Sequence, residues 1–251
     1  MTRIISIHSF RGGTGKSNTT ANIAVLLAAQ GYRVGVIDTD IQSPGIHVLF
    51  GLDDEHIGRT LNDYLHGDCS IETTVYEVTT LLAAPLDGHI FLIPASAKSG
   101  AITRVLREGY DPGELSEGFQ RLCEVLDLDV LLIDTHPGLN EETLLSIAVS
   151  DVLLIVLRPD QQDYQGTGVT VEVARKLEVP RLLMLVNKVP ASYDAALVQR
   201  RVEETYGAPV AAVLPHADDM MALGSMGIFV LRFPDHLITA LYRQAVARLM
   251  A

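Results

Sequence analysis

The sequence predicts an α/β fold in which a single doubly wound, mostly parallel sheet is flanked by helices. Apolar segments and amphipathic segments alternate along all 251 residues, which is the order expected of βαβ units. The apolar segments are continuous, as in Asp129–Asp134 (D-V-L-L-I-D), and continuous runs are typical of parallel strands buried on both faces. A glycine-rich turn follows the first of them. We expect one domain over residues 1–251, with ligands at the carboxyl ends of the strands.

The expected strands are short and rich in valine, leucine and isoleucine. In chain order they begin at Ile4 and continue as Arg33–Ile37, Thr73–Val78, His89–Pro94, Asp129–Asp134, Asp151–Leu157, Arg181–Val186 and Val210–Leu214. Of these, Thr73–Val78 is predicted only from its β-prone residues, and the rest of 67–88 is expected to be loop.

Helices are expected between the strands. They are Ser17–Gln30, Glu114–Leu126, Glu141–Val149, Val169–Leu177, Ala195–Tyr206 and Asp235–Ala251, with shorter turns within Ile41–Leu52, at Thr60–Leu65 and within Ala95–Gly113. The first is alanine-rich and meets Gly31 as a stop. The second carries an apolar face made of Leu115, Phe119, Leu122 and Val125.

Composition narrows the function classes. A formal net charge of -12 argues against a protein held to nucleic acid by bulk charge. A local DNA-binding patch stays open, because Arg200-Arg201 and Arg104 with Arg107 fit either such a patch or solvated helix faces. The two cysteines, Cys69 and Cys123, are interpreted as reduced thiols. No signal peptide and no apolar run of about 18 residues is recognised, so we expect a cytoplasmic protein.

The stretch Ile4–Asn18 (I-I-S-I-H-S-F-R-G-G-T-G-K-S-N) predicts a phosphate-binding loop. Gly12, Gly13 and Gly15 permit a turn whose backbone N–H groups point at phosphate oxygens. Lys16 would then reach the terminal phosphates and Ser17 a magnesium ion. The strict pattern has glycine six residues before the lysine, where this chain has Phe10, so the alternative is a glycine turn without a ligand.

These residues resemble a known family. F-R-G-G-T-G-K-S is similar to the deviant Walker A motif, x-K-G-G-x-G-K-[ST], of the MinD/ParA family of ATPases. D-T-D-I-Q-S-P-G-I-H-V-L-F-G resembles the first switch of that family, and L-L-I-D-T-H-P-G-L its Walker B and second switch. L-V-N-K-V-P and V-A-A-V-L-P-H resemble its base-contacting segments. The resemblance covers most of the chain.

The resemblance implies binding of ATP or ADP with Mg²⁺ and assigns residues to roles. The catalytic set is Asp40, which would orient the attacking water, Lys16 and Arg11. The nucleotide-binding set is Gly12, Gly13, Thr14, Gly15, Lys16, Ser17 and Asn18, with Asn187 and Pro215 lining the base. The metal set is Ser17, Asp38 and Asp134. Acids at strand ends suit phosphoryl transfer, which needs positioning and charge neutralisation; each acid alone would be interpreted as a cap or a solvated strand end.

Two departures from the family pattern matter. Arg11 stands where the family has the lysine that reaches the phosphates of the partner in an ATP-bound dimer; arginine keeps the charge and offers a bidentate fork, and the alternative is an exposed arginine beside the loop. His136 stands where the family usually has proline, as a pH sensor or as a solvated histidine. Asn187-Lys188 is similar to the guanine-reading N-K-x-D of GTPases, but Pro190 replaces the acid, which favours adenine.

The resemblance therefore implies an ATP-dependent molecular switch that forms a homodimer with ATP, hydrolyses it slowly, and positions a cargo through a protein activator or cargo adaptor. The alternative is a nucleotide-locked regulatory or scaffold protein with negligible hydrolysis. Residues 235–251 contain only Arg243 and Arg248 as basic residues and no bulky aromatic wedge, so we expect this helix to pack on the domain rather than bind membrane. An iron-sulfur reductase is rejected, because the cysteines lie outside the switch segments.

Overall fold

In this computed structural model residues 1–251 are described, apart from the side chain of Leu106. The strands form one eight-stranded sheet in the order β3-β4-β2-β5-β1-β6-β7-β8, and only β3 among the described strands runs antiparallel to its neighbour. They are β1 (Arg3–His8), β2 (Arg33–Asp38), β3 (Tyr76–Glu77), β4 (His89–Ile93), β5 (Val130–Asp134), β6 (Val152–Leu157), β7 (Arg181–Val189) and β8 (Val210–Pro215). The predicted fold class is confirmed.

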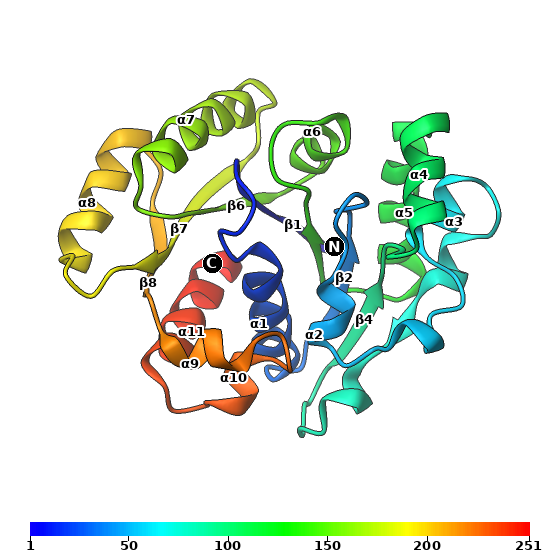
Figure 1. The fold of residues 1–251 in the computed structure, drawn as a ribbon, viewed down its shortest axis with the longest axis horizontal. Coiled ribbons are helices and arrows are strands. Elements are labelled where there is room, and N and C mark those ends of the chain that lie inside the picture. Colours follow the sequence, from blue (N-terminus) through cyan, green and yellow to red (C-terminus); the bar gives the residue numbers. More distant parts are fainter.

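Helices cover both faces of the sheet (Figure 1). The α-helices are α1 (Lys16–Ala28), α2 (Ile46–Leu49), α3 (Leu61–Leu65), α4 (Ser99–Glu108), α5 (Pro112–Val125), α6 (Glu141–Ala148), α7 (Gln161–Lys176), α8 (Ala195–Tyr206), α9 (Asp218–Leu223), α10 (Phe229–Arg232) and α11 (Leu237–Met250). Three 3-10 turns, η1 (Asp54–His56), η2 (Ile71–Thr74) and η3 (Thr79–Leu82), complete the connections.

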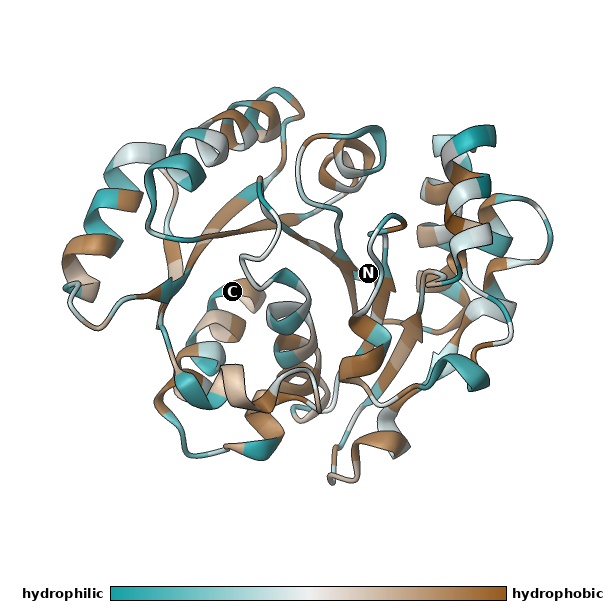
Figure 2. Cartoon of the chain, viewed as in Figure 1, coloured by the Kyte–Doolittle hydropathy of each residue, from teal (hydrophilic) through white to brown (hydrophobic). Residues whose placement is uncertain are grey.

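The core explains why the strands are continuously apolar. Val130 and Leu132 of β5 pack with α1, α2, α10 and α11 on one face, whereas Leu131 and Ile133 pack with α3, α4 and α5 on the other. Under α6, α7 and α8 the same second face continues through β6 and β7. Both faces are therefore buried, and Figure 2 shows the apolar strands inside a shell of more polar helices.

The strand order reverses at β1, which lies between β5 and β6. The chain passes from β1 to β2 on one side and later builds β6, β7 and β8 on the other. The loop after β1 therefore lies at the topological switch point of the sheet, where ligands of such folds bind.

Several predicted elements have different limits in the structure. Helix α7 begins at Gln161, not Val169, because the Asp160 side chain accepts from the Asp163 N–H and caps the earlier turn. Of Thr73–Val78 only Tyr76–Glu77 is strand, since the preceding residues form η2. Val125, predicted on the buried face of α5, is 45% exposed, because the core contact passes to Leu126.

The last part of the chain returns to the centre of the molecule. Helix α11 packs on β8 and α1, with a buried face of Ile238, Tyr242, Ala245, Val246 and Leu249. Leu237 is 61% exposed, because it begins the helix one residue before the buried stripe. Helices α9 and α10 were not predicted. None of the described helices has the length and apolar character of a membrane span.

Candidate functional site

The site is built on the loop between β1 and α1. Gly13 and Gly15 have φ angles of 76° and 100°, a left-handed backbone that favours glycine. Gly15 caps α1 without any side-chain hydrogen bond to the first turn, so the N–H groups at this helix end remain available. An uncapped helix N-terminus at a glycine loop binds anions.

Lys16 lies inside this loop rather than on the surface. It is 7% exposed, and its Nζ donates to Ser9 Oγ at 3.1 Å. Burial lowers the pKa of the Lys16 ammonium. The carboxylates of Asp134, Asp40 and Asp38 oppose that shift, in this order of strength. The fold thus brings the lysine and the three acids that the sequence singled out into one electrostatic cluster.

Asp38 and Asp134 end two neighbouring strands and stand opposite each other in the β2–β5 register. Each is 1% exposed. Burial raises the pKa of Asp38 well above its usual range, and the neighbouring Asp134 carboxylate adds to the shift. Burial also raises the pKa of Asp134 to about 6, although the Ser17 hydroxyl and the Lys16 charge lower it in part. Two adjacent buried carboxylates are stabilised by cations.

The residues around the loop fit a nucleotide with Mg²⁺. Within the described part of the chain, no three Asp, Glu, His or Cys side chains converge as a metal cage. Mg²⁺ needs no such cage, because it is held by one or two protein groups together with water and phosphate oxygens. The Ser17 hydroxyl bonded to Asp134 supplies those groups, and the free N–H groups of the loop suit phosphates.

Asp40 is held by His136, the residue that stands where the family usually has proline. The Nδ1 atom of His136 lies 2.6 Å from Asp40 Oδ1, and both side chains are largely buried. The Ser43 N–H donates to the same oxygen at 3.0 Å. His136 lies within the segment predicted to be Walker B and the second switch, and Asp40 within the predicted first switch, so the contact joins the two segments. No local sequence pattern signals a pairing between residues this far apart.

Arg11 contacts acids of its own chain. Its guanidinium Nη1 lies 3.6 Å from Asp160 Oδ1 and 3.8 Å from Asp163 Oδ1, and the side chain is 38% exposed. Arg158 pairs with the same two acids at 3.2 and 3.1 Å. Arg11 therefore lies at the surface between the loop and α7, where it is shared between its own chain and solvent.

Asn187 and Pro215, predicted to line a base, lie at the ends of the neighbouring strands β7 and β8. Asn187 is buried, and its Nδ2 donates to the Thr14 carbonyl at 2.8 Å. Lys188, which was given no separate role, donates from Nζ to the Gly13 carbonyl at 2.8 Å. The end of β7 thus contacts the loop directly.

His8 was also missed. It ends β1 and is fully buried, with Nδ1 2.7 Å from Thr135 Oγ1. Burial lowers the pKa of His8 to about 3, and the charge of Lys16 adds to the shift. The imidazole is therefore neutral at pH 7. A histidine at a strand end immediately before a glycine loop is the signal that could have indicated it.

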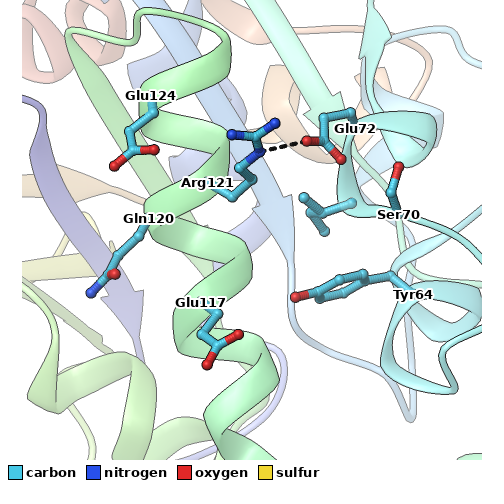
Figure 3. Close-up of a pocket in the computed structure, with 8 residues that line it drawn as sticks. Tyr64, Ser70, Glu72, Glu117, Gln120, Arg121 and Glu124 are labelled. Carbon is cyan, nitrogen blue, oxygen red and sulfur yellow. Dashed lines mark hydrogen bonds and ion pairs between the residues drawn. The ribbon is translucent and has the colours of Figure 1, made fainter.

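A separate hollow of about 390 Å³ lies between α3, η2 and α5. Figure 3 shows Glu72, Glu117 and Glu124 around Arg121, with Arg121 Nε donating to Glu72 Oε1 at 2.6 Å. The Arg121–Glu72 contact is a surface ion pair on a solvated face, and such pairs contribute little to stability.

The fold and the site define a class of protein. A glycine loop at the switch point of a parallel sheet, followed by a buried lysine and facing acids at two strand ends, is the arrangement of a P-loop nucleotide-binding protein. Among known families, the model described as "AAA domain" (AAA_31) matches residues 2–180. The chain belongs to this family, in its MinD/ParA group of P-loop ATPases.

Relatives extend the comparison. An uncharacterized ATP-binding protein of Methanocaldococcus jannaschii is 28% identical over 232 residues, covering 92% of this chain and 81% of that protein. The flagellum site-determining protein YlxH of Helicobacter pylori is 27% identical over 205 residues, covering 80% of this chain and 63% of that protein. The chain therefore spans less than two thirds of the length of YlxH.

Solved structures share the fold. The septum site-determining protein MinD of Pyrococcus horikoshii, complexed with Mg-ADP, superposes with a TM-score of 0.82 at 24% identity, over 99% of this chain and 96% of that one. In the MinC:MinD cell division complex of Aquifex aeolicus the matching chain has a TM-score of 0.81 at 19% identity, again over 99% and 96%.

Proposed function

We propose that the chain is an ATP-dependent molecular switch that binds ATP with Mg²⁺, dimerises face to face across the nucleotides and hydrolyses ATP slowly. One observation carries the proposal: the buried Lys16 lies among Asp38, Asp40 and Asp134 beside a loop with free N–H groups. Without a polyanion and a divalent cation, this cluster places two carboxylates of raised pKa in the protein interior. In a metal-bound nucleotide the cation compensates the carboxylates and the phosphates compensate Lys16.

In this proposal the loop residues Gly12–Asn18 bind the phosphates, and Lys16 reaches the terminal ones. Ser17, with Asp38 and Asp134 acting through water, holds Mg²⁺, which neutralises charge on the phosphate oxygens. Asp40 orients the attacking water. Asn187 and Pro215 line the adenine, since the acid that would read guanine is Pro190 in this chain.

The surface beside the loop supports dimerisation. A shallow hollow of about 410 Å³ lies between the loop and α7 and is lined by Phe10, Arg11 and Val169. Phe10 and Val169 are 36% and 48% exposed. Arg11 is partly exposed and its contacts with Asp160 and Asp163 are long, so a phosphate of a second copy can compete for its guanidinium. ATP then favours the dimer through a contact that the monomer lacks.

The positioning role is proposed from the relatives, which include a flagellum site-determining protein and a MinD solved with MinC. We propose that a protein activator or cargo adaptor stimulates turnover in the dimer. Helix α11 serves as a structural helix in this proposal, because its apolar stripe is buried against β8 and α1 rather than available to a membrane.

A second candidate is a nucleotide-locked scaffold with negligible hydrolysis. The contacts that favour it are Arg11 on Asp160 and Asp163 and His136 on Asp40. In that state Arg11, proposed to act in trans, and Asp40, proposed to orient water, are both bonded to residues of their own chain.

ATP turnover and molecular mass in solution distinguish the two candidates. We expect the native chain to hydrolyse ATP and to form a dimer only with ATP, and Asp40→Ala to bind ATP, dimerise and turn over at least tenfold more slowly. Equal turnover by both proteins would contradict the enzyme, and an unchanged mass would contradict the dimer. Lys16→Ala, compared by calorimetry, should bind no nucleotide.

A further inference from the structure

Strand β7 contains an irregularity beside the phosphate loop. Val186 pairs with Val213 and Val189 with Pro215, so β7 uses three steps where β8 uses two. This is the geometry of a β-bulge, with one extra residue on β7. Lys188, within the bulge, has a φ of 56°, a left-handed conformation that a lysine adopts rarely and at a cost in free energy.

The bulge has a consequence for two consecutive side chains. In a regular strand neighbouring side chains point to opposite faces. Here Asn187 Nδ2 donates to the Thr14 carbonyl at 2.8 Å, and Lys188 Nζ donates to the Gly13 carbonyl at 2.8 Å. The Lys188 N–H in turn donates to Asn187 Oδ1 at 2.8 Å. Both side chains therefore contact the same loop, at successive peptide units.

Those two bonds orient the loop. In a trans peptide the C=O and the following N–H point in opposite directions. Because Lys188 Nζ bonds the Gly13 carbonyl, the Thr14 N–H points away from Lys188. Because Asn187 Nδ2 bonds the Thr14 carbonyl, the Gly15 N–H points away from Asn187. An inward nest of N–H groups requires outward carbonyls, and each outward carbonyl needs a donor.

The packing around Gly15 confirms that this fit is close. A Cβ atom on Gly15 would lie 2.6 Å from Asn187 Nδ2, so the amide occupies the space that any other residue would need. Asn187 is buried and cannot withdraw easily, whereas Lys188 is exposed and contacts the loop through its Nζ.

We infer that Lys188 is a positioning residue for phosphate binding: together with Asn187 it braces the loop by holding the Gly13 and Thr14 carbonyls outward. This inference rests on the proposed nucleotide-binding function and adds a residue to it. Lys188 acts through the Gly13 carbonyl and not by touching the nucleotide. The brace also explains why a lysine is kept in a left-handed conformation at the end of β7.

The test compares Lys188→Met, which keeps the stem and removes the donor, with Lys188→Arg, which keeps a donor. Lys176→Met is the matched control, because Lys176 is an exposed lysine at the end of α7. The first measurement is ¹⁵N relaxation in the nucleotide-free protein. In Lys188→Met the order parameters of Gly13, Thr14 and Gly15 should fall from about 0.85 towards 0.6, while both other variants stay near the native value.

The second measurement is ADP affinity by calorimetry. Loss of one hydrogen bond at the surface should weaken ADP binding about three- to tenfold in Lys188→Met, with Lys188→Arg close to native. Unchanged order parameters in Lys188→Met, or an equal fall in the Lys176→Met control, would overturn the brace. A native chain that binds no ADP would overturn the proposed function instead, and the relaxation data would still decide whether the brace exists.

Discussion

Replacing Gly166 with alanine should separate close packing from helix propensity within α7. A Cβ atom at this position would lie 1.9 Å from Phe10 Cδ1 and 2.3 Å from Phe10 Cγ, so the ring must leave. Since Phe10 is 36% exposed, moving it into water loses only part of its burial, roughly 1–2 kcal/mol. Residual overpacking adds a cost of up to about 1 kcal/mol.

Gly168 provides the matched control in the same helix. Its added Cβ would meet only Tyr206 Cε1, at 4.0 Å, so Gly168→Ala should show the helix-propensity gain of about 1 kcal/mol without a clash. Gly166→Ala has the same gain but loses the Phe10 contact. The two variants should therefore differ in free energy of unfolding by roughly 1–3 kcal/mol.

The assay is thermal unfolding of both variants in the nucleotide-free state, where 1 kcal/mol corresponds to a Tm shift of about 2–4 °C for a chain of this size. In a Phe10→Ala background the Gly166→Ala change should become stabilising, because the clash is gone. Equal Tm values for Gly166→Ala and Gly168→Ala would refute the reasoning. An effect of Gly166→Ala on Tm that is the same with and without Phe10→Ala would refute it as well.

Three further predictions concern the site. The pKa of Asp134 is raised from 3.8 to about 6 in the folded chain, so the folded state holds the proton more tightly than the unfolded state. The free energy of unfolding of the native chain, relative to Asp134→Asn, should therefore fall by up to about 3 kcal/mol as pH rises from 4 to 6.5. Urea unfolding that shows no such fall across this range would contradict the shift. Gly15→Ala should abolish nucleotide binding in calorimetry, because its φ is 100° and the new Cβ would meet Asn187; native affinity would rule out the loop geometry. Arg11→Ala should leave the free energy of unfolding unchanged within about 1 kcal/mol, because the Arg11–Asp160 pair is solvent-exposed and Arg158 still pairs with the buried Asp163. The same change should remove the ATP-dependent dimer; a dimer of normal mass would exclude the trans contact.

Local sequence patterns predicted most of the secondary structure. Helix α8 has the predicted limits Ala195–Tyr206, because its apolar period, its Asp194 cap and Gly207 at its end all agree. The predicted helix begins at Val169, whereas α7 also contains Gly166 and Gly168, residues of low helix propensity. Gly166 is explained by a tertiary contact, because the absence of a side chain there leaves room for the Phe10 ring. A helix whose glycines serve packing is therefore poorly predicted from its own residues.

The sequence by itself determined the parallel α/β class, the glycine loop with Lys16, and acids at the ends of the strands that became β2 and β5. These features are local: a buried strand must be apolar, and a left-handed turn favours glycine. The tertiary structure decided which groups meet. Asp38 faces Asp134 because β2 pairs with β5, His136 meets Asp40 across two switch segments, and the β7 bulge brings Lys188 to Gly13, 175 residues away. Such contacts depend on strand order and on a one-residue bulge, and neither leaves a mark in the neighbouring sequence.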